Sequence, residues 1–249
     1  MANVLLVRSD WDLATRYQST YLKFLVDYAI ERTHQVKDLY NDVPNSAARL
    51  LDFENTLETF QPNIVIMGGH GNKTTITGQD LEILLKTGVN DDLMSGKITA
   101  LLTCSAGIEL GPSMISKTAQ QFYGYLADFT FVYNPNFETR PLDDPWAKAF
   151  FDCMLATGYA ILLGKTPKEV YDLTIQRYDY WWNYWIGQND PMADDILTWL
   201  NWDRSSFIAL TPTGLYGPLP KLTVPLNLSP YVLPLGIAAA FFLLSRDDK

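Results

Sequence analysis

A histidine and a cysteine each stand just beyond a short apolar run in the middle of the chain. Ile64–Met67 is followed by GGHG, which contains His70, and Ile98–Leu102 is followed by TCSAG, which contains Cys104. A cysteine attacks a carbonyl carbon as its thiolate, and a nearby imidazole can take the thiol proton and return it to a leaving amine. These residue types in this order predict acyl transfer by a His–Cys dyad.

The residues beside the dyad suit the same chemistry. The backbone N–H groups of Gly71 and Cys104 are the expected oxyanion donors, which would stabilise a tetrahedral intermediate. Ser105 begins a run of small residues that would let a substrate backbone approach. The alternative remains that Cys104 is a packed small hydrophobe and His70 a turn residue.

The two apolar runs have the length and composition of strands buried on both faces. Between them, Gln79–Lys86 carries apolar residues at 81, 83, 84 and 85, which predicts a crossover helix. Strand, helix and strand would make the two strands parallel neighbours, so His70 and Cys104 would emerge at the same carboxyl edge of the sheet.

The rest of the chain continues this alternation. We expect further strands at Val4–Val7, Val36–Leu39 and Phe129–Tyr133, helices at Leu13–Arg32, Ser46–Thr59, Ser113–Gly124, Trp146–Gly158 and Pro167–Tyr184, and a surface loop at Asn134–Pro145. The predicted fold class is α/β, with three layers and a mostly parallel central sheet flanked by helices. We expect one domain over residues 1–222, followed by an apolar tail over residues 223–249.

The composition of the chain argues against several classes of function. A net charge of −9 argues against a nucleic-acid partner. Two cysteines and two histidines are too few for a typical Cys/His zinc site, so no metal or other cofactor is expected. His34 and Cys153 lie within or beside helical patterns and are interpreted as structural. The first fifteen residues lack a signal-peptide pattern, which favours a cytoplasmic location.

Two segments leave alternatives open. Arg177–Gln188 has six aromatic residues, and its Tyr178, Trp181 and Trp185 share one helical face that favours core packing. The same residues would suit a substrate groove or a membrane interface. Leu226–Leu244 is nineteen residues without a formal charge, roughly 28 Å as a helix at about 1.5 Å per residue. It is either a membrane anchor or a buried or homo-oligomer contact.

The motifs IVIMGGHG (64–71) and ITALLTCSAG (98–107) resemble the caspase/gingipain-type (clan CD) cysteine peptidases. In that group one strand ends in His-Gly and the next ends in a cysteine followed by small residues. Phe150–Tyr171 is similar to the helix–turn–helix of gingipain-like (C25) and CHAT-type members. The resemblance implies a caspase-like fold, endopeptidase activity with His70 and Cys104 as the dyad, Gly71 at the oxyanion position, and no metal.

The resemblance also places the specificity pocket near the loop after the first strand. An arginine there would hold an aspartate of the substrate, whereas acids would hold a basic side chain. The chain offers Arg8, Asp10 and Asp12, and we expect Asp10 or Asp12 to face a basic residue of a protein or peptide substrate. The alternative is that one of them caps the helix that begins near Leu13.

Two other classes of function compete with the peptidase. A catalytically silent scaffold would keep the fold and bind partners through the aromatic helix and the tail. A glutamine amidotransferase would place its histidine after the nucleophile, and no histidine follows Cys104.

Overall fold

The computed structural model describes residues 1–40, 47–218 and 231–234 of the 249-residue chain. Its strands are β1 (Asn3–Arg8), β2 (Gln35–Tyr40), β3 (Ile64–Met67), β4 (Thr75–Thr77), β5 (Ile83–Lys86), β6 (Ile98–Leu101), β7 (Gln121–Tyr125), β8 (Thr130–Val132), β9 (Phe207–Thr211), β10 (Gly214–Tyr216) and β11 (Val232–Pro234). Its α-helices are α1 (Leu13–Glu31), α2 (Leu50–Phe60), α3 (Leu110–Ser116), α4 (Ala147–Leu162), α5 (Pro167–Ile186) and α6 (Ala193–Ser206).

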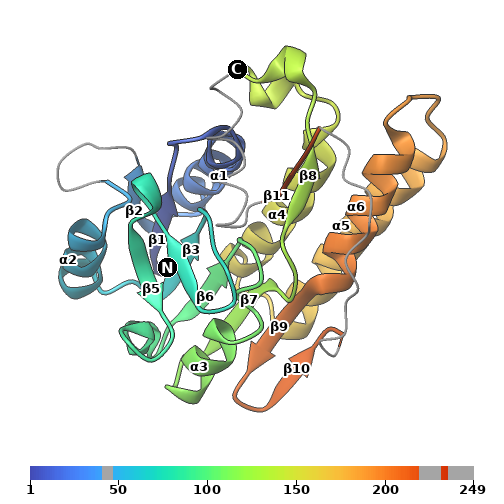
Figure 1. Ribbon diagram of the computed structural model, residues 1–249. Helices are drawn as coiled ribbons and strands as arrows, with labels where there is room; N and C mark the ends of the chain where they lie inside the picture. The colour runs from blue at the N-terminus through green and yellow to red at the C-terminus, as the bar shows by residue number, and fades with distance from the viewer. Residues whose placement is uncertain (41–46, 219–230, 235–249) are drawn as a thin grey trace.

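A seven-stranded sheet in the order β10-β9-β7-β6-β3-β1-β2 forms the middle layer (Figure 1). The strands from β2 to β7 are parallel, and β9 and β10 add an antiparallel edge. Every residue of β3 and the three inner residues of β6 are buried, as continuous apolar strands between two helical layers must be. The predicted three-layer α/β class with a mostly parallel sheet is confirmed.

Alternating side chains of the central strands pack into two separate hydrophobic cores, one on each face of the sheet. Val4, Leu6, Ile64 and Ile66 pack with residues of α1, α4, α5 and α6. Their neighbours in β1 and β3 point to the other face, where they pack with α2 and α3. The period of two along each strand therefore decides which helical layer each residue meets.

The connection between β3 and β6 differs from the prediction. Gln79–Lys86 is not a crossover helix: it forms a short 3-10 turn (Gln79–Leu81) and then strand β5, which pairs antiparallel with β4. The β-branched run before Gly78 supplies the partner strand. Strands β3 and β6 are nevertheless parallel neighbours, with Ile64 opposite Ile98, so their carboxyl ends do share one edge.

Of three further predicted elements, one divides in two, one is confirmed as a strand, and one begins later than expected. The predicted helix Ser113–Gly124 divides into α3 and strand β7, whose aromatic sequence QFYGY suits a sheet. The predicted strand Phe129–Tyr133 exists as β8 but pairs with β11, outside the main sheet. Helix α2 begins at Leu50, later than expected. Elements α6, β9 and β10 had no prediction.

The predicted core face of the aromatic segment on α5 is confirmed. Tyr178, Trp181 and Trp185 are buried, while Tyr180 and Tyr184 are exposed. Of the tail, only residues 231–234 are described, and the expectations for Leu226–Leu244 otherwise lie outside the described residues. Within the described ranges, no helix is long and apolar enough to cross a membrane.

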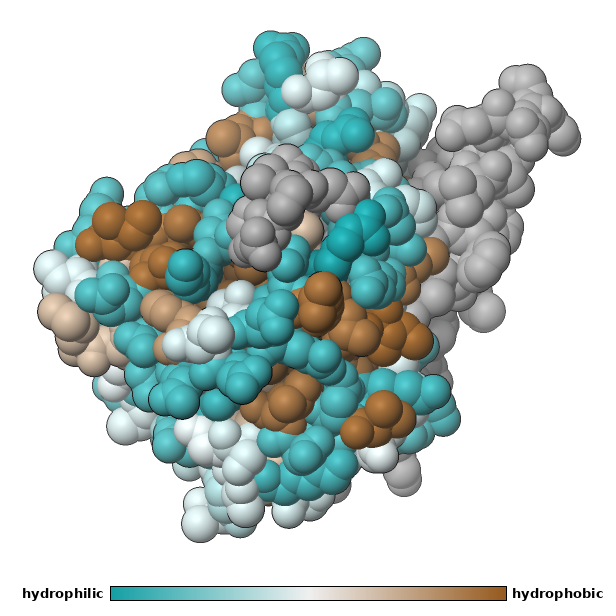
Figure 2. Space-filling view, turned by 90° about the vertical axis from the view of Figure 1, so that its left-hand side faces the viewer, coloured by the Kyte–Doolittle hydropathy of each residue, from teal (hydrophilic) through white to brown (hydrophobic). Residues whose placement is uncertain are grey.

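The face beside edge strand β2 and helix α2 carries apolar side chains in several separate groups among hydrophilic ones (Figure 2). Leu51 on α2 and Ile83 on β5 are among the exposed large hydrophobic residues. Such scattered exposure is ordinary for a folded surface and does not mark a site.

Candidate functional site

His70 is carried to the carboxyl edge of the sheet by β3 and two glycines. A Cβ on Gly68 would lie 2.4 Å from the Leu22 side chain, so α1 packs directly on the backbone there. Gly69 has a φ of +151°, a conformation that favours glycine. The imidazole that follows is completely buried, at 0% exposure.

Asp12 holds the His70 ring. Its Oδ2 lies 2.6 Å from His70 Nε2, and its Oδ1 accepts from the Thr15 N–H at the first turn of α1. Burial raises the pKa of Asp12, but the hydrogen bond and charge of His70 and the Thr15 donors outweigh it, so the pKa stays below its ordinary value. Asp12 is therefore ionised and serves both as N-cap and as the partner of the histidine.

The other ring nitrogen is left without a partner. Among the described residues, His70 Nδ1 is buried and has no hydrogen bond. A carboxylate can only accept, so in the neutral ring Nε2 carries the proton and Nδ1 presents its lone pair. Ser9 Oγ and Trp11 Nε1, from the loop after β1, are also buried and have no hydrogen-bond partner in the part of the chain that the structure describes. The Trp11 ring lies 5.9 Å from the imidazole, centre to centre.

Gly71 lies against the residue that precedes the cysteine. A Cβ on Gly71 would meet the Thr103 Oγ1 at 2.6 Å, and Thr103 Oγ1 donates to the Gly69 carbonyl over 2.8 Å. Gly71 and Ile76 lie opposite each other in an isolated antiparallel β-bridge. The hydrogen bonds of this bridge are made by the residues on either side, from the Asn72 N–H to the Thr75 carbonyl and from the Thr77 N–H to the His70 carbonyl. The N–H of Gly71 therefore points away from the β4–β5 hairpin. In the described chain, neither the Gly71 nor the Cys104 N–H donates a hydrogen bond.

The Cys104 thiol is hydrogen-bonded to the Phe129 carbonyl and not to the histidine. It is completely buried, and its thiol donates to the Phe129 carbonyl over 3.7 Å. Burial raises the pKa of this thiol well above its ordinary value, and the carboxylate of Asp128 adds to the rise. Neither ring nitrogen of His70 is hydrogen-bonded to it. In this conformation Cys104 is a neutral thiol that packs in the core on the α4 and α5 side of the sheet.

The turn after Cys104 has a strained backbone and is held by hydrogen bonds to a neighbouring segment. Ser105 has a φ of +53°, which a non-glycine residue adopts only where its surroundings enforce it. Its N–H donates to the Ala127 carbonyl over 2.9 Å, and its Oγ donates to Asp128 Oδ1 over 2.7 Å. Ser105 thus binds a neighbouring segment of the same chain, and no substrate role is visible in its contacts.

The acids and the arginine after β1 have definite partners. Asp12 caps α1 as the alternative interpretation predicted, and Asp10 lies 3.4 Å from Arg16 and accepts from Tyr40 over 3.1 Å. Arg8 is nearly buried and forms a paired contact with Asp38, so it is a structural cation of β1 and β2. Asp10 is the acid of this loop that stays partly exposed and is not bonded to the histidine.

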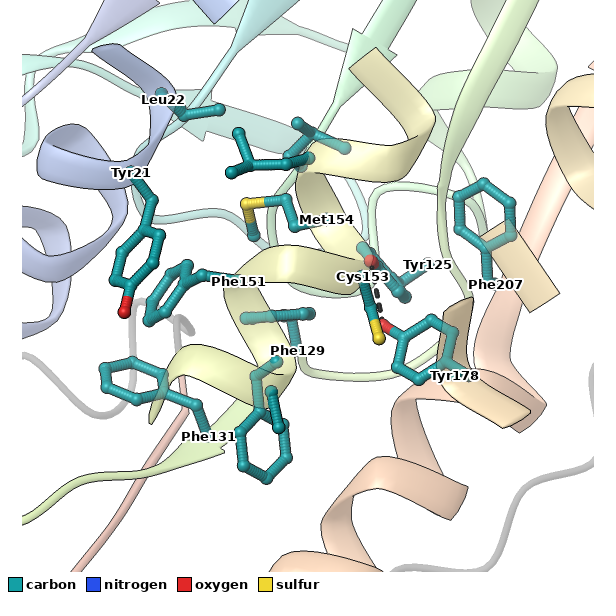
Figure 3. Close-up of a cluster of buried hydrophobic side chains, with 14 of the residues drawn as sticks. Tyr21, Leu22, Tyr125, Phe129, Phe131, Phe151, Cys153, Met154, Tyr178 and Phe207 are labelled. Atoms are coloured by element: carbon teal, nitrogen blue, oxygen red, sulfur yellow. Dashed lines mark hydrogen bonds between the residues drawn. The ribbon is translucent and has the colours of Figure 1, made fainter. Parts of the chain in front are cut away.

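The remaining candidates are structural. His34 lies 3.0 Å from the Leu162 carbonyl, and Cys153 lies on α4 beside the Tyr125–Tyr178 hydroxyl pair (Figure 3). Both cysteines are free thiols. Within the described ranges, no three His, Cys, Asp or Glu side chains are grouped so as to hold a metal ion.

No protein-family model matches this sequence, and no curated protein matches it either. The resemblance to the caspase/gingipain-type peptidases therefore rests on the two motifs and on Phe150–Tyr171 of this sequence, and it stays a prediction.

Sequence reasoning missed two features of the site. It considered Asp12 for a substrate pocket or a helix cap and did not connect it with His70, which lies 58 positions later. It also missed Asp128. Recognising 121–125 as a strand would have placed Asp128 near the same carboxyl edge.

Proposed function

We propose that this protein is a cysteine endopeptidase in which His70 is the general base and Cys104 the nucleophile. The carrying observation is the buried imidazole that Asp12 holds through Nε2, while among the described residues Nδ1 has no hydrogen-bond partner. Placing a partly buried carboxylate beside the imidazole costs desolvation free energy, and a histidine needed only for packing does not require such a partner. An orienting carboxylate with an open opposite nitrogen is how a catalytic base is positioned.

The proposed reaction needs the thiol to leave the Phe129 carbonyl. It would pass its proton to His70 Nδ1 as the sulfur attacks the peptide carbonyl carbon, and the oxyanion would be met by the N–H groups of Gly71 and Cys104. His70 would then protonate the leaving amine. Water would hydrolyse the thioester with the same base, which restores the thiol. The free N–H groups and the strained turn at Ser105 support this assignment.

For specificity we propose substrates with a basic residue before the scissile bond. Asp10 is the partly exposed acid on the loop beside the histidine, and Asp128 is an exposed acid beside the thiol. Arg8 is committed to Asp38, which disfavours recognition of an acidic side chain through that residue.

A panel of fluorogenic peptides with Arg, Lys, Asp, Asn or Leu before the scissile bond tests the proposal. We expect cleavage after Arg or Lys that is lost in Cys104→Ala and in His70→Ala. The matched control is Cys153→Ala, which removes the other buried thiol and should retain the activity. Cleavage that persists in Cys104→Ala, or none by folded and reduced wild type, contradicts it.

One observation favours the second candidate, a non-catalytic scaffold. Tyr180, Tyr184 and Ile186 are exposed near the carboxyl end of α5, and the Cys104 thiol is shielded. If Cys104 stays inert to peptidyl electrophiles under native conditions, the scaffold becomes the better account.

A further inference from the structure

The segment Leu126–Thr130 is the immediate neighbour of the candidate nucleophile. It leaves the central sheet at the end of β7 and begins β8, which belongs to a separate pair of strands. Its Phe129 carbonyl accepts from the Cys104 thiol, and its Ala127 and Asp128 are bonded to Ser105. Three consecutive residues of this segment therefore fasten the cysteine turn.

The same segment is fastened on its other side by α6. The Trp202 indole N–H donates to the Asp128 carbonyl over 2.9 Å. Asp203 Oδ1 accepts from the Thr130 N–H over 3.0 Å, and the Leu126 N–H donates to the Ser206 carbonyl over 2.8 Å. Helix α6 thus holds the segment in place over the thiol.

Burying Asp203 in this contact costs desolvation free energy. Asp203 is completely buried, and among the described residues its Oδ2 has no hydrogen-bond partner. Burial also raises the pKa of Asp203 well above its ordinary value. A buried polar atom without a partner opposes the closed arrangement, and release of the segment would give that atom access to water.

Opening does not require the core to unfold. The Phe129 ring lies 5.1 Å from the Tyr125 ring and 6.0 Å from the Phe151 ring, centre to centre, within the aromatic cluster of Figure 3. Asp128, the residue before it, is exposed. A turn of the peptide groups at 128–130 would move the Phe129 carbonyl off the thiol while the ring stays in place.

We propose that Leu126–Thr130 is an autoinhibitory latch: closed, it holds the Cys104 thiol away from His70, and it opens locally when its bonds to α6 are released. The biological role of the latch rests on the proposed peptidase function. Its existence as a local opening that exposes Cys104 does not, so the two can fail separately.

The test is the rate at which iodoacetamide alkylates Cys104 in the native, reduced full-length protein, measured by peptide mass spectrometry. Cys153 is buried on α4 and reports global unfolding in the same sample. Trp202→Phe removes one indole donor from the latch and should raise the Cys104 rate about fivefold, the change in an opening equilibrium expected for one net hydrogen bond. Cys153 should remain unmodified.

Trp146→Phe is the matched control, because its indole donates to Asp190 over 3.2 Å, away from the latch. It should leave the Cys104 rate unchanged. Ser105→Ala, which removes the hydroxyl bond to Asp128, is a second variant and should raise the rate similarly.

The latch proposal is overturned if iodoacetamide alkylates Cys104 in Trp202→Phe and in Ser105→Ala at the same rate as in wild type. It is also overturned if Cys104 and Cys153 react together, since exposure would then require global unfolding. A peptide panel in which wild type, Trp202→Phe and Ser105→Ala all fail to cleave would refute the peptidase and leave the difference in alkylation rates unchanged.

Discussion

Asp12 links two functions in one side chain. One oxygen caps α1 through Thr15, and the other holds His70, so the helix that covers the sheet also sets the orientation of the imidazole. A carboxylate at an N-cap is itself fixed by the helix, so it orients the imidazole of His70 more rigidly than a carboxylate on a free loop would.

The Asp12–His70 pair should make stability depend on pH. The folded-state pKa of Asp12 is lowered, so its stabilisation is present above the unfolded pKa of about 3.9 and is lost as pH falls through the folded value. Asp12→Asn keeps a good N-cap residue and removes the carboxylate. We expect it to lower the free energy of unfolding by about 1 to 2 kcal/mol near neutral pH.

Urea unfolding of wild type and Asp12→Asn from pH 3 to pH 7 measures this difference. The gap should shrink as the pH falls below about 4. A gap that is constant across the range would mean that the carboxylate charge contributes nothing and that Asp12 acts only as a cap.

At the scale of elements, a pair of buried hydroxyls joins α5 to the sheet. Tyr125 on β7 and Tyr178 on α5 are both completely buried, and their hydroxyl oxygens lie 3.1 Å apart (Figure 3). One hydroxyl donates to the other in a place that water does not reach, so removing either one leaves the remaining hydroxyl without this hydrogen bond.

Tyr178→Phe or Tyr125→Phe alone should lower the free energy of unfolding by about 1 to 2 kcal/mol, because one buried hydroxyl is left unsatisfied. The double variant should be no less stable than either single one, which a double-mutant cycle by urea unfolding would show. Additive losses in the double variant would mean that the two hydroxyls do not depend on each other.

The strands could be predicted from the sequence more reliably than the segments between them. Ile64–Met67 and Ile98–Leu102 are continuous apolar runs, and strands buried on both faces need little else. Gln79–Lys86 has apolar residues that fit a helix as well as a short strand, and pairing with β4 decided it. The pattern of apolar residues cannot distinguish a helix from a strand in so short a segment when a possible partner strand lies nearby in the chain.

The candidate site was predictable in position but not in orientation. The parallel neighbours β3 and β6 bring His70 and Cys104 to the same edge, as the order of the two motifs indicated. The direction of the thiol depends on the Phe129 carbonyl, which lies in the segment after β7. The sequence pattern predicts a helix over most of β7. Side-chain orientation thus depended on a strand that the pattern did not reveal.

At the scale of the whole molecule, the sheet separates two hydrophobic cores and brings the candidate site residues together at its carboxyl edge. The ends of β1, β3 and β6 contribute Asp12, His70 and Cys104, and the segment after β7 closes over the last of these. The antiparallel strands β9 and β10 extend the sheet beyond this group and carry none of its residues. Four neighbouring parallel strands therefore supply the proposed base, the acid that holds it, the proposed nucleophile and the segment that covers it.

The most direct measurement is covalent capture of Cys104 by a peptidyl chloromethyl ketone that ends in arginine, located by peptide mass spectrometry. If Asp12-held His70 activates this cysteine, wild type forms the adduct on Cys104, Asp12→Asn forms it more slowly, and His70→Ala forms almost none. Cys153 stays unmodified throughout. An adduct that forms equally fast in His70→Ala, or none on Cys104 in folded wild type, would contradict the account.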